Sequence, residues 1–81
     1  EKCYITINWP RNTRISINIY KLNGSRVYET NLNVTKQTPL NWEWDGQSSS
    51  GEKLPQGIYL IEINDGNKKE IHKLMHLSLT M

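Results

Sequence analysis

Apolar and polar residues alternate along much of this chain, which is the pattern of a β-strand with one buried face. Residues 3–9 end before Pro10 and carry apolar side chains at every second position, Cys3, Ile5, Ile7 and Trp9. Residues 14–20 show the same alternation most clearly, at Ile15, Ile17 and Ile19. The period of two predicts a strand in each segment and predicts that these side chains point into a common core.

Four further segments have the residue pattern of strands, namely residues 26–32, 40–44, 58–63 and 68–79. No window keeps apolar residues at helical spacing more convincingly than it keeps the alternation, so no helix is predicted. The polar connection before Pro39 is expected to cross from one sheet to another. In the last strand, the apolar residues expected in register are Ile71, Met75, Leu77 and Leu79.

Two tight turns are predicted from residues that favour chain reversal. Asn23-Gly24 tolerates the positive φ angles of a type I′ turn, so the flanking strands are expected to form a hairpin. The sequence Asn64-Asp65-Gly66-Asn67 predicts a second hairpin near the end of the chain. Six or seven short strands, separated by turn signals about every 8 to 12 residues, predict an all-β sandwich of antiparallel strands.

Size and charge limit the function classes. The 81 residues allow one core, so residues 1–81 are expected to form a single domain. The net charge of +2 comes from basic and acidic residues spread along the chain, which indicates neither a nucleic-acid surface nor an acidic-membrane surface. No apolar run approaches the roughly 20 residues that cross a bilayer, so membrane insertion is not expected. Since the chain starts at Glu1 without a basic-then-apolar leader, we expect it to be cut from a longer polypeptide or matured by cleavage.

The stretch WEWDGQSSSGEKLPQGIY, residues 42–59, is the first candidate for chemistry. Asp45, Gln47 and Ser49 alternate as in a calcium loop, but Ser50 stands at the glycine position and Gln56 at the position of the closing carboxylate. The glycines and the proline of this segment instead favour a connector that turns corners between two strands. No metal site and no cofactor are predicted here.

Two histidines have the outer spacing of a zinc-protease motif. His72 and His76 enclose Lys73 where that motif places its general base, and on a strand the two rings would lie about 13 Å apart. We therefore expect solvated surface histidines. Cys3 cannot form an internal disulfide and is expected to be buried as a small apolar residue. The sequence contains no recognisable catalytic signature, so no enzyme is predicted.

Three tryptophans admit two interpretations. Trp42 and Trp44 share the face of Leu40 by alternation, and with Trp9 they are expected to pack in the core. The alternative is a carbohydrate-binding module, in which Trp9, Trp42 and Trp44 form an exposed, roughly coplanar platform for sugar rings. Quenching of tryptophan fluorescence by a soluble quencher or an added polysaccharide separates the two interpretations.

The order of these pieces resembles a known family. The segments read ITINWP, RISINIYKLNGSRVY, WEWDGQSSSGEKLPQGIYLIEI and KKEIHKLMHL. They are similar to the small immunoglobulin-like domain of the flagellar hook-capping protein and to C-terminal domains of secreted bacterial proteins, including type IX secretion sorting domains. The resemblance spans nearly the whole chain. The chain lacks the family's Pro-x-Pro opening and continues for eight residues beyond Lys73.

This resemblance implies an immunoglobulin-like β-sandwich that is not catalytic and forms the C-terminal part of a longer secreted bacterial protein. Its implied function is export, sorting, surface attachment or positioning of an attached passenger or catalytic domain. The implied partners are that passenger and the secretion or cell-surface machinery. The residues implied in recognition are Gly57, Tyr59, Lys68, Lys69 and Lys73. A flagellar hook-cap assembly domain is a further alternative.

Overall fold

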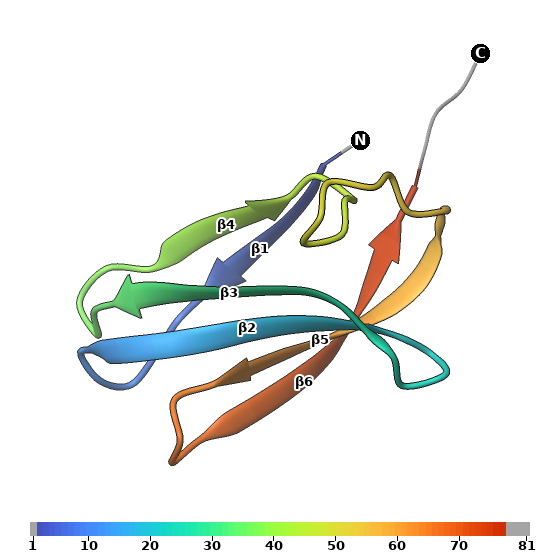
Figure 1. Cartoon of the computed structure of the whole chain (residues 1–81). Coiled ribbons are helices and arrows are strands. Elements are labelled where there is room, and N and C mark those ends of the chain that lie inside the picture. Colours follow the sequence, from blue (N-terminus) through green and yellow to red (C-terminus); the bar gives the residue numbers. More distant parts are fainter. Residues whose placement is uncertain (1, 78–81) are drawn as a thin grey trace.

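The part of the chain that the structure describes folds into a β-sandwich of six antiparallel strands. The computed structural model describes residues 2–77 (Figure 1). A two-stranded sheet pairs β1 with β4, and a four-stranded sheet has the order β3-β2-β5-β6. The all-β prediction and both predicted hairpins are confirmed, and the chain crosses between the sheets after β3 as expected. The strands are β1 (Cys3–Ile7), β2 (Thr13–Lys21), β3 (Arg26–Val34), β4 (Leu40–Trp44), β5 (Gly57–Asn64) and β6 (Lys69–His76).

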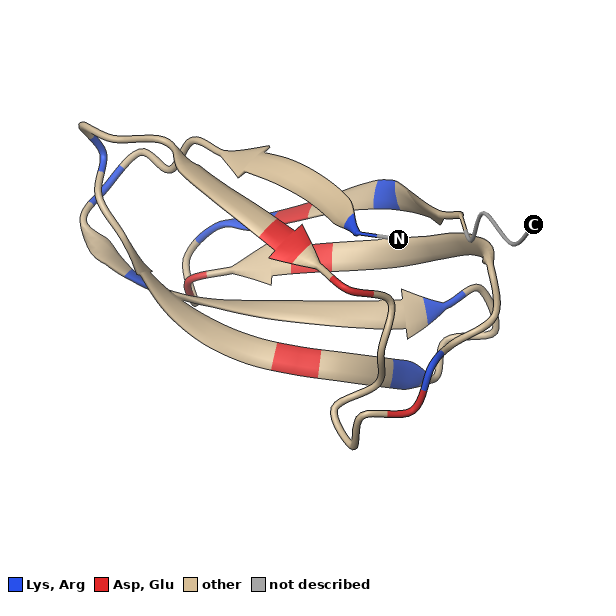
Figure 2. Cartoon of the chain, turned by 90° about the horizontal axis from the view of Figure 1, so that it is seen from above, with Lys and Arg blue, Asp and Glu red and all other residues tan. Residues whose placement is uncertain are grey.

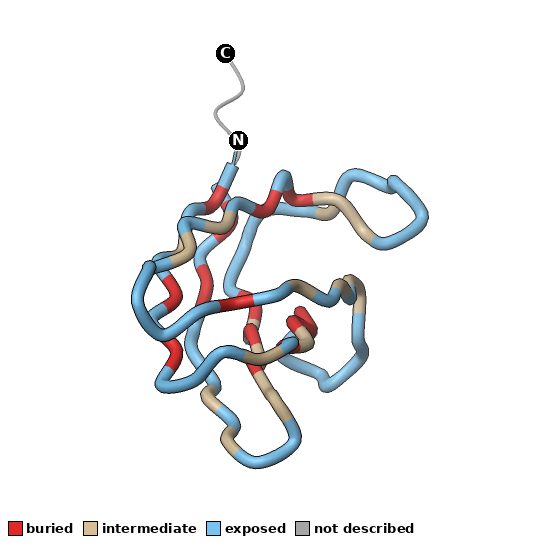
Figure 3. Tube along the Cα trace, turned by 90° about the vertical axis from the view of Figure 1, so that its left-hand side faces the viewer, coloured by how far each residue is buried: buried red, intermediate tan, exposed pale blue. Residues whose placement is uncertain are grey.

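The core lies between the two sheets and is built mainly by the central strands β2 and β5. These strands pair directly, so that Ile17 lies opposite Ile63 and Ile19 opposite Ile61. All four side chains are fully covered, and Figure 3 shows buried segments on strands of both layers. Because burying an isoleucine side chain stabilises a fold by about 1.5–3 kcal/mol, this ladder is the main hydrophobic contribution of the large sheet. Cys3, as predicted, is buried at the edge of this core.

The β2–β3 turn differs from the predicted type I′ turn. A type I′ turn needs a positive φ at both central residues, but Gly24 has φ +93° and Asn23 does not have a positive φ. The Gly24 N–H donates to the Lys21 carbonyl, and a register shift follows between Ile19 and Tyr20. The turn therefore has the geometry of a three-residue loop whose last residue is a left-handed glycine, followed by a bulge.

The apolar phase predicted for β6 is wrong. Ile71 and Met75 are each 59% exposed, whereas the buried positions are Leu74 and His76. Leu77 is also exposed, and Leu79 lies outside the described residues. The outer side of the four-stranded sheet faces no second layer, so isoleucine and methionine can occupy the solvent face of β6 without breaking the fold. Within residues 2–77 the strand ends at His76, earlier than predicted.

The connector between β4 and β5 packs on a buried histidine. His76 is 5% exposed, which corrects the prediction of a surface histidine, and its Nε2 lies 3.2 Å from the carbonyl oxygen of Leu54. Its ring lies against Trp44 and Tyr59. Gly46 approaches this ring so closely that a Cβ atom there would come within 2.6 Å of Nε2. His72, in contrast, is exposed as predicted and contacts Glu70.

Asp65 fixes the opposite end of the sandwich. Its Oδ2 accepts a hydrogen bond of 2.9 Å from the Trp9 indole, and Arg11 Nε lies 3.3 Å away. Its Oδ1 accepts the backbone N–H groups of Asn67 and Lys68. The hydrogen bond from Trp9 and those from the backbone lower the pKa of Asp65 from 3.8 to about 2. The carboxylate thereby joins the β5–β6 turn to the segment after β1.

The stability of the domain is expected to fall in acid because of Asp65. A carboxyl group whose pKa is lowered in the folded state stabilises the fold above its ordinary pKa of 3.8, and that stabilisation disappears as the pH falls towards about 2. Thermal unfolding between pH 5 and pH 2, compared for the native chain and Asp65→Asn, measures this term. The native chain should lose stability more steeply than the variant over this interval. Parallel curves would show that Asp65 does not carry the effect.

Candidate functional site

The candidate site is the solvent-facing side of the β5–β6 hairpin. Direct pairing places Ile58 opposite Met75, Leu60 opposite Lys73 and Asn64 opposite Lys69. Five exposed residues share this side, and we call them the outer hairpin face: Ile58, Lys69, Ile71, Lys73 and Met75. The face combines exposed apolar side chains with two ammonium groups, which is a surface suited to contact with another protein.

The period of two explains why these residues meet. In β5 the alternate residues Tyr59, Ile61 and Ile63 are buried, so Ile58 and its even-numbered neighbours turn to solvent. In β6 burial falls on Leu74 and His76, which directs the odd-numbered residues to the same side of the sheet. The outer hairpin face is thus the reverse side of the best-packed part of the core, and the packing keeps its backbone in place.

Two of the three lysines implied by the resemblance lie on this face. Lys73 is exposed and has no ion pair within the described residues, and Lys69 Nζ lies 3.8 Å from Glu62 Oε2. Lys68 belongs to the turn instead. Its Nζ lies 5.0 Å from the centroid of the Trp9 ring and 2.9 Å from Glu70 Oε2. The hydrogen bond from Lys68, and to a smaller extent the one from His72, lower the pKa of Glu70. Lys68 therefore already has intramolecular partners.

The implied Gly57 and Tyr59 have different surroundings. Gly57 opens β5, is exposed and lies opposite His76. Tyr59 is 4% exposed, its hydroxyl donates to the Pro55 carbonyl, and burial raises the pKa of its phenol. Its ring packs edge to face on the Trp44 ring, and the two ring centroids lie 5.3 Å apart. Tyr59 thus fastens the end of the connector to the core, and its side chain is not part of the outer hairpin face.

The tryptophans do not form a sugar platform. Trp9 and Trp44 are 3% and 1% exposed, and the Trp44 indole donates to the Gln47 carbonyl. Trp42 is half-buried and lies against Tyr28, with ring centroids 6.1 Å apart. The alternative of a carbohydrate-binding module required at least two exposed, coplanar indoles, and the structure corrects it in favour of core packing.

The side-chain oxygens considered for a metal site accept backbone hydrogen bonds instead. Asp45 Oδ1 accepts the Gln47 N–H, and Ser49 Oγ accepts the N–H of Glu29 in β3. Residues 2–77 contain no group of three or more potential metal ligands. Nor do these residues include a helix that could span a membrane. Figure 2 shows acidic and basic residues interspersed over the ribbon rather than gathered by sign.

The sequence reading missed the exposed apolar part of this face. Ile71 and Met75 alternate with polar residues, and this pattern wrongly predicts that they lie in the core. The signal that identifies their side is that Lys69 and Lys73 share their parity, and lysine is almost never fully buried without a partner. The two lysines therefore indicate that the odd-numbered residues of β6 face solvent.

Comparison with known proteins agrees with this architecture. Among solved structures, the flagellar hook-capping protein FlgD from P. aeruginosa is similar with a TM-score of 0.75 and 24% sequence identity. The alignment covers 93% of this chain and 60% of that one, and it supports the fold alone. No curated protein sequence gives a significant match. The family described as secretion system C-terminal sorting domain matches residues 1–76. Since that match covers nearly the whole chain, the protein belongs to the secretion system C-terminal sorting domain family.

Proposed function

We propose that this domain directs the export or surface attachment of a polypeptide joined to it, and that the outer hairpin face contacts the secretion machinery. Family membership over residues 1–76 is the observation that carries the proposal. The face adds a physical means, since Lys69 and Lys73 stand beside exposed Ile71 and Met75 on one side of the sheet. The proposal assigns no catalytic step to the domain.

The two parts of the face have different roles in such a contact. Exposed apolar side chains supply affinity when they are removed from water, at roughly 25 cal/mol per Å². Lysine ammonium groups contribute more to orientation and to the rate of encounter than to affinity. Lys73 has no acidic neighbour within ion-pair distance among residues 2–77, so its charge remains available to a partner.

A reporter fusion in a bacterium that carries this secretion system tests the proposal. The domain should bring the reporter to the cell surface or the medium, and its deletion should leave the reporter inside the cell. The double variant Lys69→Glu/Lys73→Glu should reduce the exported fraction about tenfold, since reversal of two contact charges costs on the order of 1.4 kcal/mol or more.

The matched control changes two lysines away from the outer hairpin face. Lys36→Glu/Lys53→Glu alters the net charge equally, and both residues are exposed. Export of this variant should match that of the native domain, while thermal unfolding verifies that both double variants are folded. If the reporter leaves the cell equally well with the domain deleted, the domain has no sorting function. If both double variants export alike, the outer hairpin face is not the contact.

A further inference from the structure

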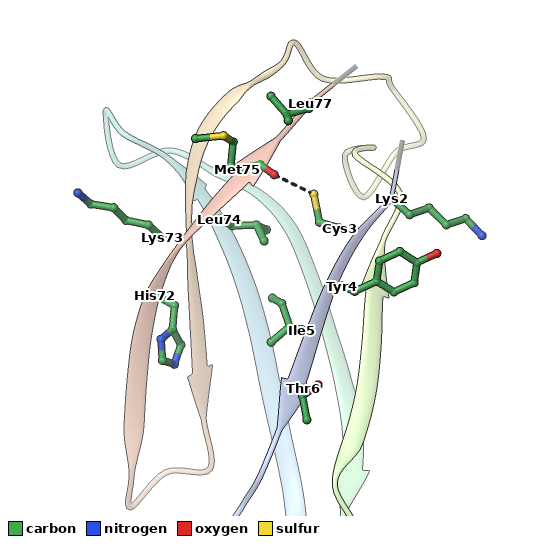
Figure 4. Close-up of a pocket in the computed structure, with 10 residues that line it drawn as sticks. All are labelled: Lys2, Cys3, Tyr4, Ile5, Thr6, His72, Lys73, Leu74, Met75 and Leu77. Atoms are coloured by element: carbon green, nitrogen blue, oxygen red, sulfur yellow. Dashed lines mark hydrogen bonds between the residues drawn. The ribbon is translucent and has the colours of Figure 1, made fainter. Parts of the chain in front are cut away.

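A groove of about 520 Å³ separates β1 from β6, the facing edges of the two sheets (Figure 4). Within the described residues β1 pairs only with β4, and β6 pairs only with β5. The two edges meet at one end of the groove, where the Cys3 thiol donates to the Met75 carbonyl at 3.2 Å. From that contact they diverge, and Figure 4 shows Cys3, Ile5 and Leu74 directed into the space between them.

The Met75 contact shows which backbone groups of β6 face the groove. In an antiparallel sheet the N–H and C=O of one residue point to the same side, and alternate residues repeat this direction. Since the Met75 carbonyl points to β1, the backbone groups of Lys73 and Ile71 also point away from β5. β6 thus offers an unpaired strand edge next to an apolar floor, which is the geometry that accepts an additional strand.

The side chains around the groove define the strand that fits. The inner side carries the apolar residues Cys3, Ile5 and Leu74 and also His72, which contacts Glu70. The neighbouring outer positions on β6 are Ile71, Lys73 and Met75. None of the groove-lining residues is an aspartate or a glutamate. Lys2 and His72 are paired with Glu43 and Glu70, but Lys73 has no acidic partner among residues 2–77. An added strand would therefore bury alternate apolar side chains and place the intervening side chains beside an unpaired cation.

We infer that the β1–β6 groove binds an extended segment of another protein in which apolar and acidic residues alternate. The segment adds to the free edge of β6, its apolar residues contact Ile5 and Leu74, and an acidic residue lies next to Lys73. Opposite charges on adjacent strands stabilise such pairing by about 0.2–1 kcal/mol, and like charges oppose it. The inference concerns the groove itself and holds whether or not the outer hairpin face directs export.

A second copy of this chain is a poorer occupant. Two β6 edges paired with each other would bring Lys69 and Lys73 of one copy beside the lysines of the other. Lysines on an edge strand are a common means of preventing such self-pairing. The same lysines favour a partner strand of opposite charge, so the charge of the edge selects against the copy and for the acidic segment.

The test is an amide NMR titration of the chain with two ten-residue peptides. One alternates valine with glutamate, and the other alternates valine with lysine. The acidic peptide should shift amide resonances of β1 and β6 and slow hydrogen exchange at Ile71 and Lys73. Lys73→Glu should lower the affinity for the acidic peptide at least about fivefold and raise the affinity for the basic peptide, as expected for reversal of a cross-strand charge pair. Lys36→Glu should change neither affinity by as much.

Several results would overturn the inference. They are no binding of the acidic peptide, equal binding of the two peptides, and resonance shifts confined to strands other than β1 and β6. Sedimentation showing dimers that Lys73→Glu strengthens or weakens would assign the edge to a second copy instead. A chain that directs export but binds neither peptide refutes strand addition and leaves the sorting proposal intact. A chain that binds the acidic peptide but does not direct export supports strand addition and refutes the sorting proposal.

Discussion

Trp44→Ala is expected to lower the free energy of unfolding by about 3–5 kcal/mol, the range for truncating a buried tryptophan. Its side chain is 1% exposed, meets Tyr59 edge to face and donates to the Gln47 carbonyl, so the variant loses packing and also leaves that carbonyl without its donor. For a domain of this size the melting temperature should fall by about 12 °C or more. Thermal unfolding followed by circular dichroism measures the change.

Trp42→Ala is the matched control for this substitution. Trp42 is the same residue type on the same strand, but it is half-buried and packs on Tyr28 at the edge of the sandwich. Truncation of a half-buried side chain leaves a smaller cavity, so Trp42→Ala should lower the free energy of unfolding clearly less than Trp44→Ala does. Equal losses for the two variants would contradict the central position of Trp44 in the core.

Gly46→Ala is expected to destabilise the domain by about 2–5 kcal/mol, from two independent causes. Gly46 has φ +79°, and a non-glycine residue in the left-handed region costs roughly 1–2 kcal/mol. The new methyl group would also overlap the His76 ring, which cannot move away because Trp44 and Tyr59 contact it. Overpacking of this kind costs about 1–3 kcal/mol. Urea-induced unfolding measures the total.

Two controls separate these causes. Gly51 has φ +90° but open space around its Cβ position, so Gly51→Ala should cost only the backbone part, roughly 1–2 kcal/mol. In a His76→Ala background, Gly46→Ala should cost a similar amount, because the obstructing ring is gone. If Gly46→Ala is no more harmful than Gly51→Ala in the native background, the close approach of Gly46 to His76 does not limit this position.

The alternation of apolar residues was enough to predict the fold. Ile15, Ile17 and Ile19 all point inward, and both predicted hairpins exist. The prediction holds where the aliphatic residues of a strand all share one face, as in β2, because one face of the strand is buried and the other is not. Trp9 and Trp44, which the alternation also predicts in the core, are buried there as well.

β6 shows where this reasoning fails. Ile71 and Met75 lie in solvent because the outer side of the four-stranded sheet faces no second layer, whereas Leu74 and His76 of the same strand face the core. The burial of His76 depends on the connector between β4 and β5, which folds back through a contact with Leu54. That contact joins residues 22 positions apart, and no local pattern encodes it. The candidate site was therefore predicted in its lysines but not in its apolar residues.

The thiol contact between Cys3 and Met75 places the first residues of β1 and the last residues of β6 at the same end of the molecule (Figure 1). Tension applied between those two points would separate each strand from its neighbour pair by pair. The pairs Cys3–Trp44 and Gly57–His76 would open first, and the others would follow in turn. A ladder opened sequentially yields at much lower force than one whose bonds all resist together. Traction between the start of β1 and the end of β6 is thus met by one strand pair at a time.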